Sequence, residues 1–515
     1  MATPQEKLAQ SLEVLKRLQN NLGIAIIKAE AISRVHKERL LKNGFIKEVM
    51  KGWYISCNPE ERAGDTTSWY ASYWQFCEIY LNDKFGEEWC VSPEQSISIH
   101  SENWTIPSQL IIRSTKANNQ KTDLLYNTSL YMMNLSMPGE NEIIEKNGIH
   151  LFSLPSALIS CTPSYFVQKP IDARAALGSI RDASEILSHI LKGGNSRIAG
   201  RLAGAFRNIG KDRIADDIIK TMKAADYDVR ESDPFENKLQ FSFANKSESP
   251  YVSRIKLMWQ ELREQIIEYF PEPPGIPNDK TKYLKIVEEN YKTDAYHSLS
   301  IEGYKVTPEL IERVKSGNWD PEKNEKDKKE KDAFAARGYY LAFEAVRKSI
   351  QKVFDGENPG KVVDDDHGNW YRELFAPSVT AGLIQRADLA GYRNAQVFIS
   401  QSNHIPMSPT GVRDAMPTLF ELLKNESEPA IRTVLGHYVF VYIHPYMDGN
   451  GRMARFLMNV MLASGGYPWT IIPVERRNEY MNALERASVG QNIGDFTKFI
   501  ADLVSAGIKQ GSFTK

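Results

Sequence analysis

Twelve consecutive residues, HPYMDGNGRMAR at 444–455, gather side chains whose types could do chemistry together. The imidazole of His444, with an ordinary pKa of about 6.5, can take a proton near neutral pH. The carboxylate of Asp448 is a hard oxygen ligand, the type that Mg²⁺ takes when it shares coordination with nucleotide phosphates. Arg452 and Arg455 can grip phosphate oxygens. This combination indicates phosphoryl or nucleotidyl transfer, in which positioning and charge neutralisation do most of the work.

Two predicted helices position this segment. The preceding residues, EPAIRTVLGHYVFVYI, are apolar at helical spacing. Because the residue before a proline is disfavoured in the α region, this helix should stop at His444 and leave its side chain on a loop. RMARFLMNVML then begins a second helix, whose unpaired N–H groups and dipole form an anion cradle. A histidine at a helix end and two surface arginines would explain the single residues, but not the set.

The motif resembles the Fic motif HPFx(D/E)GNGRxxR, with Tyr446 in place of the phenylalanine. GYRNAQVFISQSNHIP (391–406) resembles the Fic flap hairpin, and GGYPWTIIPVERRNEYMNALERAS (465–488) resembles the region that closes over adenine. The resemblance covers roughly residues 280–505. It implies an all-α domain with a small β-hairpin flap. It also implies an enzyme that transfers AMP from ATP to a Tyr, Thr or Ser hydroxyl of a target protein and releases pyrophosphate.

By this resemblance, His444 is the base that deprotonates the target hydroxyl, Asp448 holds Mg²⁺, and Tyr480 contacts the nucleoside. Relatives that phosphorylate their target carry a lysine where this chain has Gly451, so the glycine favours AMP transfer. The residues that the resemblance places on the ATP phosphates are Gly449, Asn450, Gly451, Arg452 and Arg455.

The predicted flap offers a docking edge for the target protein. VFISQSN alternates as an exposed edge strand does, and an incoming segment could pair with residues 396–406 through main-chain hydrogen bonds. Such pairing would place a hydroxyl over the α-phosphate.

A second motif lies upstream. TDAYHSLSIEGYKV resembles the inhibitory motif (S/T)xxxE(G/N) of Fic proteins. Ser298 and Glu302 are four residues apart and share a helix face, and Gly303 can close that helix. The resemblance implies that Glu302 forms a salt bridge with Arg455, removes the partner of the γ-phosphate and misaligns the α-phosphate.

Two rival functions stay open on the sequence. Some Fic enzymes with the inhibitory glutamate remove AMP from modified targets, and Glu302 would then orient water. Alternatively, the chain is a DNA-binding regulator whose Fic domain only senses nucleotide.

The first 58 residues support that second rival. LAQSLEVLKRLQ and a stretch at 29–42 have helical patterns, and FIKEVMKGWYIS follows as a β-wing. Seven Lys or Arg against three Glu lie between residues 28 and 51. This order loosely resembles the winged-helix antitoxins of abortive-infection systems and implies DNA binding through phosphate neutralisation. A packing module without DNA explains the pattern equally well.

The middle of the chain predicts an α+β module. WYASYWQFCEIYL reads as helical, whereas SISIHS, QLIIRST and GIHLFSL read as extended. Residues 195–223 predict two short helices with one basic side, which faces water or DNA. The charged run at 320–332 predicts a solvated loop that leads into a helix near Ala333.

The composition places these parts in a multidomain globular chain. A formal net charge of −1 gives no overall field toward nucleic acid or membrane, and no long apolar run predicts a membrane span. The four cysteines lack metal-site spacing and are expected as buried thiols in a cytoplasmic protein. A homodimer is left open. The predicted domains are a winged-helix-like domain (1–58), an α+β module with a helical end (59–230), a linker and lead-in (231–279) and the Fic domain with its inhibitory helix (280–510).

Overall fold

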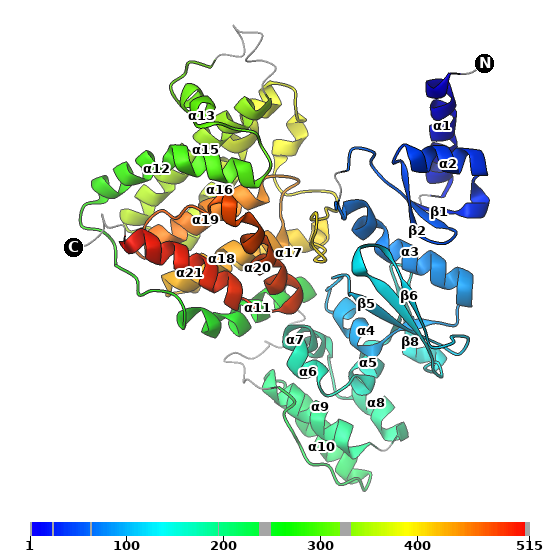
Figure 1. Ribbon diagram of the computed structural model, residues 1–515. Coiled ribbons are helices and arrows are strands. Elements are labelled where there is room, and N and C mark those ends of the chain that lie inside the picture. Colours follow the sequence, from blue (N-terminus) through cyan, green and yellow to red (C-terminus); the bar gives the residue numbers. More distant parts are fainter. Residues whose placement is uncertain are drawn as a thin grey trace. The chain divides into compact units, whose positions relative to one another are not determined.

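The structure is a computed structural model that describes residues 3–22, 25–61, 64–193, 195–235, 249–319 and 331–509 (Figure 1). The chain divides into two compact units. The first contains residues 1–250 together with 398–405, and the second contains residues 251–397 and 406–515. None of the described helices combines the length and the apolar character that crossing a membrane requires.

The first unit begins with the predicted order of helix, helix and β-hairpin. The hairpin strand β3 also pairs antiparallel with a short strand that precedes α2, in the sheet order β1-β3-β2. The second helix starts later than predicted, because the side chain of Ser33 caps it by accepting from the His36 N–H. These elements are α1 (Pro4–Leu22), β1 (Ile26–Lys28), η1 (Ala29–Ala31), α2 (Arg34–Lys42), β2 (Ile46–Met50) and β3 (Trp53–Ser56).

Much of the basic charge in this region is engaged within the chain. Lys28 pairs with Asp83, Arg34 pairs with Glu38, and the Lys47 ammonium donates to the hydroxyl of Tyr126 at 2.7 Å. Fewer cations are therefore free for phosphate contacts than the sequence count suggests. The winged-helix class and DNA binding stay predictions.

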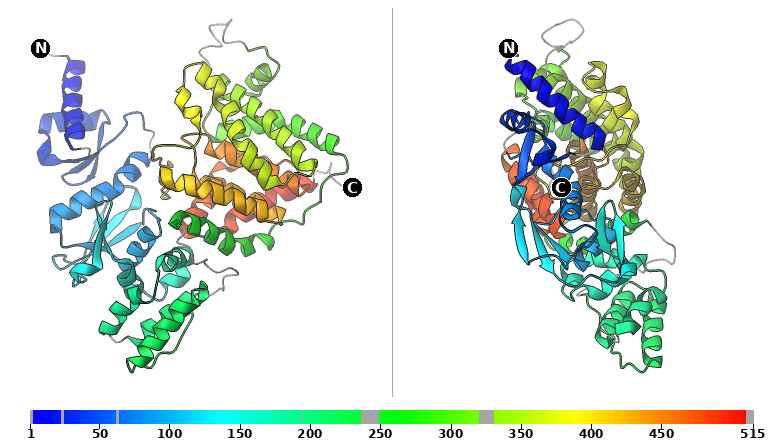
Figure 2. Two further views of the ribbon diagram at one scale, coloured as in Figure 1. Left: turned by 180° about the vertical axis from the view of Figure 1, so that it is seen from behind. Right: turned by 90° about the vertical axis from the view of Figure 1, so that its right-hand side faces the viewer.

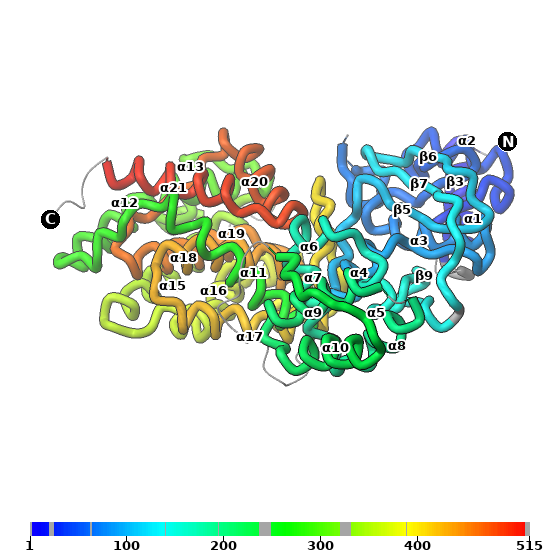
Figure 3. Tube along the Cα trace, turned by 90° about the horizontal axis from the view of Figure 1, so that it is seen from below, coloured from blue at the N-terminus to red at the C-terminus, as the bar shows by residue number. Residues whose placement is uncertain are grey.

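The α/β part of the first unit packs an aromatic helix, α3, against small sheets (Figure 3). Its larger sheet has the order β4-β5-β7-β6, with β5 and β7 parallel, and β8 pairs with β9. Cys77 and Cys90 are buried here, Cys161 is buried nearby, and Cys57 is half-buried. The elements are α3 (Thr67–Phe85), β4 (Cys90–Val91), β5 (Gln109–Ser114), β6 (Gln120–Asp123), η2 (Leu125–Asn127), β7 (Ser129–Asn134), η3 (Glu140–Glu142), β8 (Ile143–Lys146) and β9 (Ile149–Phe152).

One predicted strand of this part is a helix. SISIHS lies in α4 (Pro93–His100), where Ile97 and Ile99 are both buried. The Ser92 side chain accepts from the Gln95 N–H, and Pro93 occupies the first helical position. This helix-start signal outweighs the short alternation of apolar residues.

In the helical end of the first unit, two residues of the predicted basic side, Arg207 and Lys211, bind groups of the same unit. Arg207 forms ion pairs with Asp212, Asp216 and Glu231. The ammonium of Lys211 donates to two carbonyl groups at the end of α7. Both short helices predicted at 195–223 are present as α9 and α10. The helices are α5 (Leu154–Ser160), α6 (Tyr165–Gln168), α7 (Pro170–Ser179), α8 (Ser184–Gly193), α9 (Ser196–Asn208) and α10 (Asp212–Ala224).

The second unit is largely helical (Figure 2). The stretch predicted as a linker contains α11 (Pro250–Ile267), because Trp259 and Leu262 bury an apolar face and Arg263 pairs with Glu426 of the same unit. The charged run at 320–330 lies outside the described residues, and the helix expected near Ala333 begins at Lys331. The other helices are α12 (Lys280–Ile301), α13 (Pro308–Lys315), α15 (Lys331–Phe354), α16 (Pro359–Thr380), η4 (Arg386–Ala390), α17 (Pro409–Asn425), α18 (Pro429–Ile443), α19 (Asn450–Ser464), η5 (Val474–Arg476), α20 (Arg477–Gly490) and α21 (Gly494–Lys509).

The predicted flap hairpin has no β-strand. The amide of Gln396 donates to the carbonyl of Pro406 at 2.7 Å, so a side chain joins the two legs of the segment. At the tip, Gln401 has a φ of +63°, and the Ser402 N–H donates to the Ile399 carbonyl in a turn. Turn geometry therefore replaces the expected ladder.

The flap tip, residues 398–405, belongs to the first unit. The Ile106 N–H donates to the Asn403 carbonyl at 2.9 Å, and the Asn403 side chain donates to the Ile106 carbonyl at 3.1 Å. The Gln401 N–H donates to the Thr66 hydroxyl at 2.8 Å. Part of the backbone edge predicted for target docking is therefore already hydrogen-bonded.

Candidate active site

His444 stands on a strained turn between α18 and α19. Helix α18 ends at Ile443, as the following proline predicts, and His444 adopts the left-handed conformation with φ 55° and ψ 61°. Its Nδ1 lies 3.3 Å from the Val441 carbonyl. Because a carbonyl can only accept, Nδ1 carries the proton, and the lone pair is assigned to Nε2. Among the described residues, Nε2 makes no hydrogen bond.

The surroundings of His444 favour a neutral imidazole. Burial lowers the pKa of His444 to about 4, and the charge of Arg393 acts in the same direction. The Val441 carbonyl, Glu302 and Asp448 oppose the shift without reversing it. This pKa lies below the ordinary value expected from the sequence, so the ring is a free base at neutral pH.

The loop after His444 is braced from inside. The Tyr446 N–H donates to Oδ1 of Asn450, and Nδ2 of Asn450 donates to the Tyr446 carbonyl, both at 2.9 Å. The ring of Tyr446 stacks on Tyr371 with centroids 3.8 Å apart, so Tyr446 keeps an aromatic anchor in place of the phenylalanine of the motif. The Asn450 side chain is thus committed to the loop. A phosphate contact from Asn450, as predicted, would have to use its backbone N–H.

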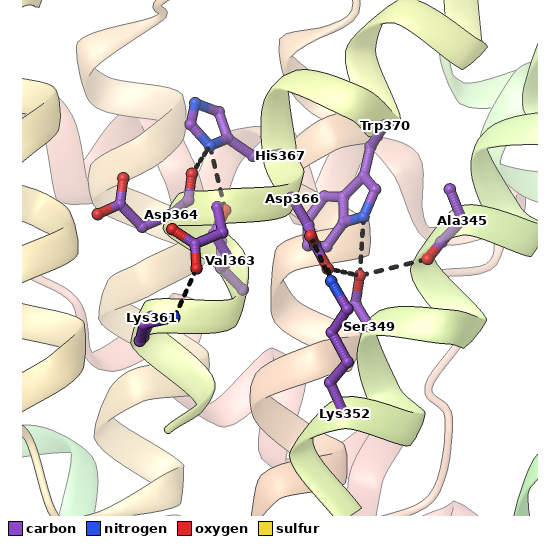
Figure 4. Close-up of polar contacts among 10 residues, drawn as sticks. Ala345, Ser349, Lys352, Lys361, Val363, Asp364, Asp366, His367 and Trp370 are labelled. Carbon is purple, nitrogen blue, oxygen red and sulfur yellow. Dashed lines mark hydrogen bonds and ion pairs between the residues drawn. The ribbon is translucent and has the colours of Figure 1, made fainter. Parts of the chain in front are cut away.

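Gly449 permits the close approach of this loop to α16. Its φ is +84°, and a Cβ there would lie 2.7 Å from the ring of Phe375. Helix α16 is itself fixed on α15, because Trp370 donates to the Ser349 hydroxyl, which donates to Asp366, and Lys352 pairs with the same carboxylate (Figure 4). The loop therefore rests on a rigid helix pair.

The start of α19 carries unused hydrogen-bond donors. Arg452 is 1% exposed and donates from Nη2 to Asp448 at 3.2 Å. Within the described part of the chain, its buried Nε and the buried Nη1 of Arg455 have no hydrogen-bond partner. Buried donors without acceptors call for a ligand, and phosphate oxygens suit two guanidinium groups beside a helix N-terminus.

Asp448 fits the role of a lone magnesium carboxylate. Its side chain is 64% exposed. The described residues contain no group of three or more His, Cys, Asp or Glu able to hold a metal by themselves. Mg²⁺ often uses only one or two carboxylates and completes its octahedron with substrate phosphates and water. Asp448 could therefore hold Mg²⁺ only together with a nucleotide.

The predicted inhibitory residues meet Arg455. Nη2 of Arg455 lies 2.6 Å from Oε1 of Glu302, and Nε donates to the Ser298 hydroxyl at 2.9 Å. Gly303, with a φ of +89°, follows the end of α12. A Cβ at Gly451 would lie 2.4 Å from Oε1 of Glu302, so this carboxylate stands over the first turn of α19.

Glu302 is held in its ionised form. Burial acts to raise the pKa of Glu302, but the charges of Arg455 and Arg452 outweigh burial and lower it below the ordinary value. The negative charge at the start of α19 therefore persists at neutral pH.

A second buried acid, Asp294, lies in the inhibitory helix α12 itself and was not predicted. Asp294 lies one helical turn before Ser298, and the Tyr339 hydroxyl donates to it at 2.6 Å. Burial raises the pKa of Asp294 to about 6. Its spacing of four residues from Ser298 in TDAYHSLSIE was a usable signal.

Tyr480 is not on an accessible surface. The ring is 1% exposed, and its hydroxyl lies 3.0 Å from Nε2 of His437. The contact of Tyr480 with the nucleoside stays a prediction.

The sequence analysis also did not predict a role for Arg393. It lies in GYRN, before the flap, yet it is 2% exposed, and its Nε donates to the carbonyl of His444 at 2.8 Å. A single buried arginine in a loop has no periodic pattern that would reveal it.

The sequence model of the Fic/DOC family matches residues 365–462, which include α16, the flap segment and the whole motif. All of these matched residues belong to the second unit except the flap tip, residues 398–405.

The relatives are protein adenylyltransferases. The chain is 27% identical over 255 residues to "Protein adenylyltransferase Fic" of Nematostella vectensis, covering 48% of this chain and 55% of the relative. It is 27% identical over 237 residues to "Protein adenylyltransferase fic-1" of Caenorhabditis elegans, covering 45% and 43%. With the Drosophila yakuba Fic it shares 32% identity over 168 residues, covering 28% and 33%. The chain thus spans about half the length of these relatives or less. Residues 365–462 thus match the Fic/DOC family, and the chain is similar to Fic protein adenylyltransferases over at most about half of its length.

Solved structures are also similar. Fic-1 from C. elegans has 21% identity and a TM-score of 0.36, covering 66% of this chain and 96% of that one. A Fic domain containing signaling protein from Bacteroides thetaiotaomicron has 20% identity and a TM-score of 0.36, covering 52% and 99%.

Proposed function

We propose that this protein transfers AMP from ATP to a Tyr, Thr or Ser hydroxyl of a target protein and of itself, and that Glu302 restrains the transfer. The observation that carries the proposal is the set of unsatisfied buried donors on Arg452 and Arg455 at the start of α19. This phosphate-binding arrangement follows directly on the loop of His444, whose Nε2 is free to accept a proton.

The residues of the loop suit each part of the reaction. Nε2 of His444 takes the proton of the target hydroxyl, and the hydroxyl oxygen bonds to the α-phosphorus of ATP. The bond from the α-phosphorus to the oxygen that bridges to the β-phosphate then breaks. Pyrophosphate leaves with the bonding electrons, and AMP remains as an ester on the target. Mg²⁺, held by Asp448 and the phosphates, neutralises charge when bound.

The proposed brake acts by competition for Arg455. The Glu302 carboxylate lies 2.6 Å from Arg455 and covers Gly451 at the first turn of α19. A γ-phosphate bound to Arg455 would meet this negative charge. ATP would then bind with its α-phosphate out of line with the attacking hydroxyl.

The target protein is proposed to dock on the flap, residues 396–406. Because the tip backbone already bonds to Thr66 and Ile106, strand addition along the tip requires this segment to leave its partners. Gln396, at the base of the flap, lies outside that contact.

Removal of AMP from a modified protein is the second candidate function. It is favoured by the ionised Glu302 carboxylate beside the phosphate-binding donors, where it could orient an attacking water.

Labelled ATP tests both functions. The full chain, Glu302→Gly and Glu302→Gly/His444→Ala are incubated with lysate and ATP labelled on the α-phosphate, and parallel samples receive ATP labelled on the γ-phosphate. AMP transfer predicts strong α-label incorporation only in Glu302→Gly, with no γ-label. No α-label in any protein, combined with release of AMP from a modified target by the wild type, would favour the second function.

A further inference from the structure

A buried arginine outside the Fic motif holds the turn that carries His444. The Nε of Arg393 donates to the His444 carbonyl at 2.8 Å, and the backbone N–H of Arg393 donates to the next carbonyl, that of Pro445, at 2.9 Å. We propose that Arg393 is a positioning residue, which fixes the backbone turn that aims the imidazole of His444. This inference rests on the proposed transfer reaction for its kinetic consequences.

The conformation of His444 needs outside support. A φ of 55° is disfavoured for a residue with a Cβ, because the side chain approaches the following carbonyl. Strained backbone of this kind persists only where neighbouring groups over-determine it. Arg393 binds two consecutive carbonyls of the turn from one residue, which restricts rotation on both sides of the bond between His444 and Pro445.

The same guanidinium joins the legs of the flap. Nη1 donates to the Ala395 carbonyl at 2.9 Å, and Nη2 donates to the carbonyl of Met407. Arg393 therefore links the flap base to the His444 turn through backbone acceptors alone. A planar group with fixed donors can hold these acceptors together, which the single ammonium of a lysine cannot do.

Arg393 also acts on His444 through charge. Burial, with the nearby charge of Arg413, lowers the pKa of Arg393 to about 10, so the group is still a cation at neutral pH. Its charge lowers the pKa of His444, against the opposite effects of Glu302 and Asp448. A neutral residue in this position would lose both the planar set of donors and the positive charge. Lysine would lose the planar set of donors but keep the charge.

Kinetics in the full-length Glu302→Gly background test the positioning role. Arg393→Met and Arg393→Lys should each lower kcat for AMP transfer by about tenfold or more, because misplacing a reacting group is costly, while KM for ATP stays nearly unchanged. Arg386→Met is the matched control, since Arg386 is an exposed arginine in η4, shortly before Arg393 in the chain. It should retain kcat within about twofold, as surface substitutions usually do.

A titration of the imidazole gives a readout that does not depend on transfer. Histidine ring resonances of the full chain are followed against pH by NMR, and His444 is identified by the signal missing in His444→Ala. The pKa of His444 should move upward in Arg393→Met and stay in place in Arg393→Lys and Arg386→Met.

Unchanged kcat and an unchanged His444 titration in Arg393→Met would overturn the proposal. If circular dichroism shows that Arg393→Met does not fold, Arg393→Lys decides, and its full activity would overturn the proposal equally. If Glu302→Gly itself transfers no AMP, the proposed function fails, and the His444 titration still decides whether Arg393 acts on the ring.

Discussion

Arg455 and Arg393 both belong to the second unit and are almost fully buried, but they differ in what they bind. Arg455, 4% exposed, faces the carboxylate of Glu302 on another helix. Arg393, 2% exposed, donates only to backbone carbonyls of neighbouring loops. A carboxylate can be exchanged for a phosphate of similar charge, whereas carbonyl groups of the same chain cannot leave. The first arrangement suits a switch, and the second suits a fixed support.

Removing the arginine of the exchangeable pair should have the largest effect. Arg455→Met leaves the mostly buried carboxylate of Glu302 without its partner, at a cost of about 3 kcal/mol in the free energy of unfolding. Glu302→Gln should restore much of this loss in the double variant. Denaturant unfolding of the four proteins measures the coupling between the two positions. A coupling below about 0.5 kcal/mol would mean that the two residues do not interact.

Removing the carboxylate should instead release activity. Glu302→Gly frees Arg455 for the γ-phosphate, and incorporation of AMP should rise by about 100-fold, which corresponds to about 2.7 kcal/mol. Initial rates with ATP labelled on the α-phosphate measure it. Glu309→Gly, at an exposed glutamate of the following helix, serves as the control and should leave the rate low. Equal rates in wild type and Glu302→Gly would contradict the proposal that Glu302 restrains the transfer.

Asp294 tests whether the switch extends one turn further back along the inhibitory helix. Its pKa of about 6 in the fold exceeds the value of about 3.9 in an unfolded chain, so the folded state binds this proton more tightly. The carboxyl therefore lowers stability as pH rises from about 4 to about 6, by about 3 kcal/mol. Asp294→Asn should lack this part of the pH dependence. Unfolding curves at pH 4.5 and pH 7 for both proteins would reveal it, and identical pH dependences would contradict it.

The support that Arg393 gives to the turn of His444 predicts a small effect of pH on activity. Because the pKa of His444 is about 4, kcat/KM of Glu302→Gly should change little from pH 8 down to pH 5 and fall only toward pH 4. A pH profile in mixed buffers of constant ionic strength measures this acid limb. A limb near pH 6.5 would show an ordinary, unsupported imidazole.

The sequence predicted those parts of the site that carry a local signal. His444 before a proline, the glycine-containing start of α19 and the spacing of Ser298 and Glu302 each correspond to a backbone rule, and the structure has the predicted contacts. The salt bridge with Arg455, about 150 residues along the chain from Glu302, followed only from the resemblance to a family.

Other features depended on tertiary contacts and could not be predicted. Arg393 is a charged residue in a loop, and only the fold shows that it is buried. SISIHS alternates like a strand, but its capping residues make it α4. The prediction of an edge strand in the flap was wrong for a similar reason. The alternation of residues suggested strand pairing, but a side-chain bond from Gln396 and the turn at Gln401 take its place.

The flap tip has a practical meaning for anyone who separates the two halves of this gene. Residues 398–405 are flanked in sequence by the second unit but belong to the first. Their hydrogen-bond partners include Thr66 and Ile106. A fragment that starts at residue 251 would retain this octapeptide without those partners and would expose Ile405 to solvent. Protease cleavage of such a fragment should begin there, and its target preference should differ from that of the intact protein.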